Sequence, residues 1–178
     1  MDILVSACLL GTPCRYDGAS RPCGELARLE VLGHRLIPVC PEVMGGLPTP
    51  RPPAELQRDG RVVDRAGKDV TEAYRLGAEE VLELARAHRC TLAVLKERSP
   101  SCGRGQIYDG SFTGRLTEGS GVTARLLEEH GVQVYGESEA GTLAERGEAR
   151  EEGQRAPCPL PCRSPASALC RPPWAPRR

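Results

Sequence analysis

The sequence L-K-E-R-S-P-S-C-G-R-G occupies residues 95–105 and contains the sharpest structural break in the chain. It follows an apolar run at residues 90–95, whose length and composition are typical of a buried strand. The run ends at S-P-S-C-G, residues 99–103, which is a turn-forming cluster. In open α/β sheets, ligands bind beyond the carboxyl ends of the strands. Cys102 is therefore either a site residue or a buried thiol beside a turn. The other segments of the sequence are needed to distinguish these two interpretations.

Three more strands are expected elsewhere in the chain. Residues 3–10 form a continuous apolar run, and residues 35–39 and 132–134 are shorter runs of the same kind. Helical periodicity with suitable start and stop residues predicts helices at residues 22–33, 71–88 and 122–130. Because strands and helices alternate, the strands should pair in parallel with helices covering the sheet. We expect a small Rossmann-like α/β domain with a parallel sheet of about four strands.

The connections between these elements are unusually rich in glycine and proline. Residues 43–55 form a long loop of a kind that is usually functional or disordered. Asp59-Gly60 predicts a β-hairpin within residues 56–63. A second glycine-rich loop is expected at residues 99–121. No G-x-G-x-x-G motif follows the first strand, so the nucleotide-binding fingerprint is missing.

The last part of the chain has a different composition. Residues 140–178 are first of mixed charge and then contain mainly Pro, Arg, Ala and Cys, without Val or Ile. Such a segment cannot bury enough apolar area to offset its ordering entropy, about 1–2 kcal/mol per residue. We expect one folded domain at residues 1–139 and a disordered tail at residues 140–178.

Composition excludes several classes of partner. The 24 basic and 24 acidic residues cancel, so neither nucleic acid nor a membrane surface is expected as a partner. The start of the chain lacks the features of a signal peptide, and no apolar run is long enough to span a bilayer. We therefore expect a cytoplasmic protein. In that compartment the 9 cysteines indicate metal binding or catalysis more than disulfides.

Cysteines follow three of the expected strands. Cys8 and Cys14 belong to the end of the first strand and the loop after it, Cys40 follows the second, and Cys102 follows the third. Because parallel strands end at the same edge, these thiols should converge. The histidines lie near the ends of expected helices, where they are typical of C-terminal caps. Ligation by sulfur alone favours an iron–sulfur cluster or a structural zinc ion.

Five segments, in this order, resemble the 2-thiouracil desulfidase family. They are S-A-C-L-L-G-T-P-C-R-Y-D-G (6–18), P-V-C-P-E-V-M-G-G-L-P-T-P-R-P-P-A-E (38–55), G-K-D-V-T (67–71), L-K-E-R-S-P-S-C-G (95–103) and I-Y-D-G-S-F (107–112). The resemblance covers residues 2–139. It implies a [4Fe-4S] cluster held by three cysteines, with one iron open to the substrate. It also implies a non-redox, hydrolytic desulfuration, in which a small thiocarbonyl compound becomes a carbonyl compound and sulfide leaves.

The resemblance also assigns roles to particular residues. The cluster ligands should come from Cys8, Cys14, Cys40 and Cys102. We expect one ligand per strand end, with Cys14 as the residue that could replace one of the other three.

The implied acid–base residue matches Glu42, which could take a proton from the attacking water. The implied serine matches Ser101 or Ser99, and we favour Ser101 because it adjoins Cys102. Arg51 has two interpretations: it contacts a group of the substrate, or it pairs with an acidic side chain.

Two other functions remain open at this point. A sulfur transferase could use the same cluster to carry sulfide to a nucleoside, although a neutral protein is a poor match for an RNA substrate. Alternatively, the cysteines could hold zinc in a binding module without catalytic activity. Iron content and colour separate the zinc hypothesis from both enzyme hypotheses.

Overall fold

A parallel sheet organises the computed structural model, which describes residues 1–145. The sheet has four strands in the order β2-β1-β5-β8. These are β1 (Asp2–Ser6), β2 (Arg35–Val39), β5 (Leu92–Leu95) and β8 (Gln133–Gly136). All neighbouring pairs are parallel, so the carboxyl ends of the strands lie at one edge. The predicted α/β fold is therefore confirmed.

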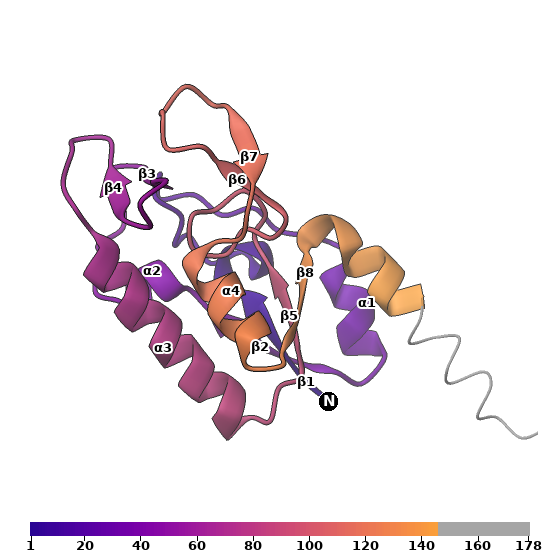
Figure 1. The fold of residues 1–178 in the computed structure, drawn as a ribbon. Coiled ribbons are helices and arrows are strands. Elements are labelled where there is room, and N and C mark those ends of the chain that lie inside the picture. Colours follow the sequence, from indigo (N-terminus) through magenta and orange to yellow (C-terminus); the bar gives the residue numbers. More distant parts are fainter. Residues whose placement is uncertain (146–178) are drawn as a thin grey trace, which may run out of the picture.

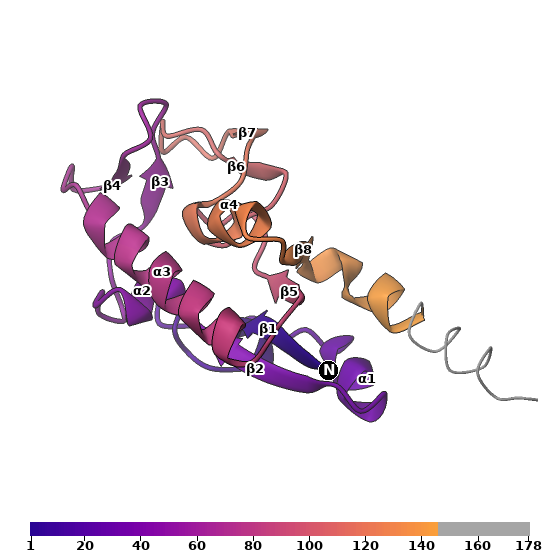
Figure 2. The same ribbon diagram turned by 60° about the horizontal axis from the view of Figure 1, so that its bottom comes forward.

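Helices cover both faces of the sheet, as Figures 1 and 2 show. One face carries α3 (Thr71–Ala87) and α4 (Val122–Glu129), and the other carries α1 (Leu26–Val31). Successive side chains of a strand point to opposite faces, so the central strands contribute side chains to two hydrophobic cores, one on each face of the sheet. Leu4 and Leu95 pack with α3 and α4, whereas Val5 packs with α1.

The first strand is shorter than predicted. It stops at Ser6, and residues expected to continue it form the 3-10 helix η1 (Ala7–Leu10). Gly11 follows with a φ of 96°, a conformation that favours glycine. The apolar run did not distinguish strand from helix here, because its side chains are buried in both. The helix predicted at residues 22–33 is likewise shorter, because within that range only the residues of α1 are helical.

Two hairpins lie at the carboxyl edge of the sheet (Figure 1). The predicted one pairs β3 (Ala54–Leu56) with β4 (Val62–Asp64). The second pairs β6 (Gln106–Tyr108) with β7 (Leu116–Glu118), within the segment that was expected to be a loop. They contact each other, because Gln57 Nε2 donates to the Gly110 carbonyl oxygen at 3.2 Å.

The folded part extends past the expected boundary at residue 139. The 3-10 helix η2 (Glu137–Glu139) leads into helical residues 140–145, in which Ala140 and Ala144 are completely buried. They pack in the core on the α1 side of the sheet. The remainder of the expected tail, residues 146–178, lies outside the described residues. Within residues 1–145 no helix combines the length and the apolarity required to cross a membrane.

Candidate functional site

Four cysteines lie just beyond the carboxyl edge of the sheet. Cys8 is in η1, and Cys14 is in the loop that follows it. Cys40 lies between β2 and the short helix α2 (Pro41–Met44), and Cys102 is in the loop after β5. All four are free thiols; three are buried and Cys40 is half-buried. Each therefore has the placement that the strand ends predicted.

The thiols affect one another's ionisation. Burial raises the pKa of Cys8, and the neighbouring Cys40 raises it further. Burial followed by Cys40 also raises the pKa of Cys14 to about 12. Burial raises the pKa of Cys102 against an opposing hydrogen bond from Ser6, with Cys40 and Cys8 adding to the rise. Cys8, Cys14 and Cys102 therefore share one environment with Cys40, and without a metal these three thiols are protonated at neutral pH.

The spacing of these groups is not that of a site for a single ion. The Cys40 Sγ donates to the Cys14 carbonyl oxygen at 3.7 Å. Within residues 1–145, no three His, Cys, Asp or Glu side chains are placed to bind one metal ion together. The described residues therefore contain no preformed site for a single metal ion.

Glu42 is held beside this group by α2. Pro41 occupies the first position of α2, where its fixed φ suits a helix start. The backbones of α2 and α3 approach so closely that a Cβ on Gly45 would lie 1.9 Å from the Ala73 carbonyl oxygen. Glycine is thus required at this contact, which determines where Glu42 lies.

Arg51 binds Glu42 in a nearly buried ion pair. The Arg51 Nε donates to Glu42 Oε2 at 2.7 Å, and a terminal nitrogen of Arg51 lies 2.6 Å from the same oxygen. The side chains of Arg51 and Glu42 are only 5% and 14% exposed. Of the two interpretations of Arg51, the structure supports pairing with an acidic side chain.

The two candidate serines have different partners. Ser99 Oγ lies 3.5 Å from Glu42 Oε1 and accepts the backbone N–H groups of Ser101 and Cys102. Ser101 is completely buried, and its hydroxyl pairs with Thr123 Oγ1 of α4 at 2.8 Å. The structure therefore brings Ser99 to Glu42 and turns the favoured Ser101 toward α4.

Two buried polar side chains near the site were not singled out from the sequence. Tyr74 of α3 is buried, and burial raises its pKa, followed by the nearby charge of Glu42 and a hydrogen bond to it. Ser6 ends β1, and its hydroxyl accepts the Lys96 N–H at 2.9 Å. A tyrosine on the buried stripe of a helix usually has a polar partner, which was the available signal for Tyr74.

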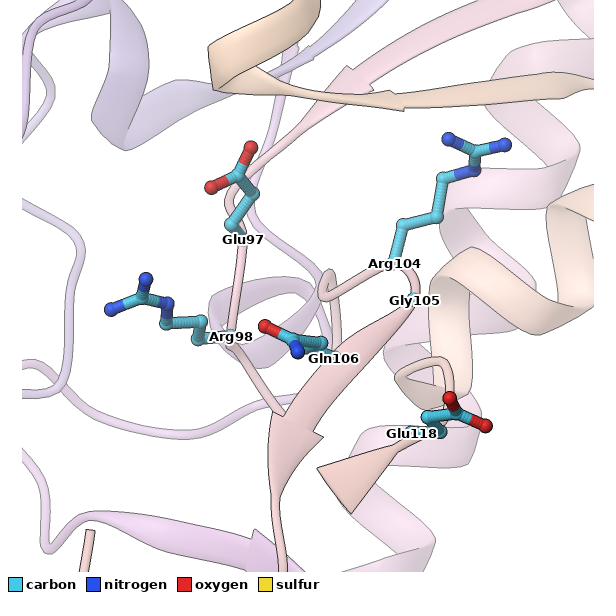
Figure 3. A pocket seen from close by; sticks show the side chains of 6 residues that line it. All are labelled: Glu97, Arg98, Arg104, Gly105, Gln106 and Glu118. Carbon is cyan, nitrogen blue, oxygen red and sulfur yellow. The ribbon is translucent and has the colours of Figure 1, made fainter. Parts of the chain in front are cut away.

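A hollow of about 370 Å³ lies near the carboxyl end of β5, but it does not include the cysteines. It is lined by Glu97, Arg98, Arg104, Gly105, Gln106 and Glu118. Figure 3 shows that the charged ends of these side chains point in different directions rather than toward a common centre. Arg104 is already paired with Glu128 and Glu139. The cysteine group next to Glu42 is therefore the better candidate for a reactive centre.

Known proteins share both the sequence and the fold. The family model described as 2-thiouracil desulfurase matches residues 3–139. The uncharacterized protein YbbK of Bacillus subtilis (strain 168) is 44% identical, over 77% of this chain and 96% of its own length. A solved structure of the [4Fe-4S]-dependent thiouracil desulfidase TudS is 49% identical, with a TM-score of 0.76. That alignment covers 83% of this chain and 98% of the solved one.

Proposed function

The chain belongs to the 2-thiouracil desulfurase family, and from this premise we propose that it removes sulfur from a thionated pyrimidine or a similar small thioamide. We assign it a [4Fe-4S] cluster bound by Cys8, Cys40 and Cys102, with Cys14 as the alternative ligand. The observation that carries this proposal is the meeting of four free cysteines beside the ion-paired Glu42.

The chemistry of the donor set fits such a cluster. Thiolates are the usual ligands of iron–sulfur clusters, and the four cysteines lie near one another without a histidine among them. The raised pKa values of Cys8, Cys14 and Cys102 mean that cluster binding by these residues must displace their protons. Three ligands and one spare cysteine would leave one iron without a protein ligand.

The proposed reaction exchanges sulfur for oxygen without electron transfer. When bound, the cluster supplies a Lewis acid for the soft sulfur of the substrate. Glu42 Oε1 accepts a proton from water, and the water oxygen forms a bond to the thiocarbonyl carbon. The carbon–sulfur bond then breaks, and sulfide leaves with the protons taken from water. Ser99 lies 3.5 Å from Glu42 Oε1, where it can orient the water or pass a proton.

The first test is to purify the protein without oxygen and to measure iron, colour and sulfide release from 2-thiouracil and 4-thiouracil. We expect brown protein with about four irons per chain. Cys102→Ala should lose the cluster and the activity together. A colourless protein with one zinc ion would instead support the binding module. Transfer of sulfur to a nucleoside in place of sulfide release would support the transferase.

The role of Glu42 is tested by Glu42→Gln. The variant should keep the cluster spectrum, because Glu42 is not a cluster ligand, and should lose about 10²–10⁴-fold in sulfide release. Glu79→Gln is the matched control, since this carboxylate lies on the exposed side of α3 and pairs with Arg75. Turnover at the wild-type rate in Glu42→Gln would show that the acid–base assignment is wrong.

A further inference from the structure

We propose that Arg51 is a positioning residue, which holds one oxygen of Glu42 and leaves the other oxygen for the reaction. This inference rests on the proposed function, because it concerns the group assigned there as the base. It assigns Arg51 no contact with the substrate.

Every N–H of the Arg51 guanidinium has a partner. An arginine side chain has five N–H donors. Nε and one terminal nitrogen contact Glu42 Oε2, and the latter nitrogen also donates to the Cys14 carbonyl oxygen at 3.1 Å. The other terminal nitrogen donates to the Pro48 carbonyl oxygen and to Thr49 Oγ1, both at 3.1 Å. No donor is left for a substrate.

The two oxygens of Glu42 are therefore not equivalent. Arg51 makes both of its contacts with Oε2. The Ser99 hydroxyl lies 3.5 Å from Oε1, a distance at the limit of a hydrogen bond, and the buried Tyr74 hydroxyl also hydrogen-bonds the Glu42 carboxylate. Because the guanidinium occupies Oε2 with one hydrogen bond and a second ion-pair contact, the proton from water should go to Oε1.

Arg51 also links the base to the cysteine group. Its contacts with Pro48 and Thr49 are within its own loop, but its contact with Cys14 crosses to the loop after η1. The backbone adds a second link, because the Arg51 N–H donates to the Tyr16 carbonyl oxygen at 2.8 Å. A shift of this loop would therefore move Glu42 relative to the cysteines.

The experiment measures kcat and KM for sulfide release from 2-thiouracil by cluster-loaded Arg51→Ala. Loss of a positioning contact should lower kcat by about 10²-fold and leave KM within about threefold of the wild type. Added guanidinium ions should restore part of the lost kcat in Arg51→Ala and none in Glu42→Gln. Arg35→Ala is the matched control, because Arg35 binds the Asp2 carboxylate at the opposite end of the sheet. It should keep the wild-type kcat.

The competing outcomes are distinct. A rise in KM with an unchanged kcat, or weaker binding of the unreactive product uracil, would mean that Arg51 binds the substrate. A wild-type protein without sulfide release would refute the proposed function itself, whereas active wild type and fully active Arg51→Ala would refute only the inference.

If Arg51→Ala does not fold, Thr49→Val removes one exposed partner of the guanidinium. It should lower kcat by up to about fivefold with KM unchanged, and an unchanged kcat would overturn the inference.

Discussion

Ser99 and Ser101 lie two residues apart, but their hydroxyls serve different neighbours. Ser99 Oγ accepts two backbone N–H groups of its own turn while facing Glu42. Ser101 pairs with Thr123, and its carbonyl oxygen accepts the Thr123 and Ala124 N–H groups at the start of α4. We therefore assign the role beside the base to Ser99, and a role in attaching α4 to Ser101.

Alanine substitutions should separate these two roles. Ser99→Ala should reduce sulfide release per bound iron far more than Ser101→Ala does. Ser101→Ala should lower the free energy of unfolding by about 1–3 kcal/mol, because the buried Thr123 hydroxyl loses its partner. Urea unfolding and iron-normalised activity measure the two effects. If Ser101→Ala is the less active protein at equal iron content, the assignment of Ser99 is wrong.

The sequence could place the cysteines but not choose between the serines. Cys8, Cys40 and Cys102 each follow a strand, and a parallel sheet necessarily brings its strand ends to one edge. The direction of a hydroxyl depends instead on the turn. Here Gly103 donates its N–H to the Ser99 carbonyl oxygen at 2.8 Å, which closes the turn and points the two serines apart. Nothing in S-P-S-C-G encodes that direction by itself.

The contact between α2 and α3 determines the position of Glu42. A Cβ on Gly77 would lie 1.8 Å from the Pro41 carbonyl oxygen, just as one on Gly45 would collide with Ala73. Since backbone atoms are on both sides, no side chain can move aside to relieve the collision. The two helices are therefore in contact through their backbones, and Glu42 follows any movement of α2.

Gly45→Ala should force these helices apart. Overpacking at such a contact costs about 1–3 kcal/mol, so the free energy of unfolding should fall by that amount. Sulfide release should fall as well, because Glu42 moves with α2. Gly24→Ala is the matched control, since its Cβ would meet no atom within 4 Å and its φ is not positive. Equal stability and activity of the two variants would show that α2 has room to adjust.

The long elements were predictable, whereas the short ones depend on tertiary contacts. The helix predicted at residues 71–88 matches α3, because its buried side chains recur at helical spacing. The hairpin of β6 and β7 was missed because each strand has only three residues, and only Ile107 is buried. Its support comes from the other hairpin, where Glu55 accepts the Phe112 N–H at 2.9 Å. Such a contact cannot be recognised from either segment alone.

The site depends on the covering of both faces of the sheet. Cys102 packs in the core shared with α3 and α4, whereas Cys8 and Cys14 pack in the core on the α1 side. The cysteine group therefore spans the edge where the two cores meet. Loss of packing on either face should disturb the group, even when no cysteine is changed.

The helical residues 140–145 provide part of this covering, which leads to a test by truncation. Ala140 and Ala144 are completely buried in the core that contains Cys8 and Cys14, together with Leu26 and Leu29 of α1. A chain that ends at residue 139 loses this covering, whereas one that ends at residue 145 keeps it. The shorter chain should be less stable by at least about 2 kcal/mol, because apolar surface of α1 becomes exposed to water. It should also retain less iron after purification without oxygen. Unfolding in urea and iron analysis compare the two proteins, and equal stability and iron content would show that the folded domain ends at residue 139, as the composition suggested.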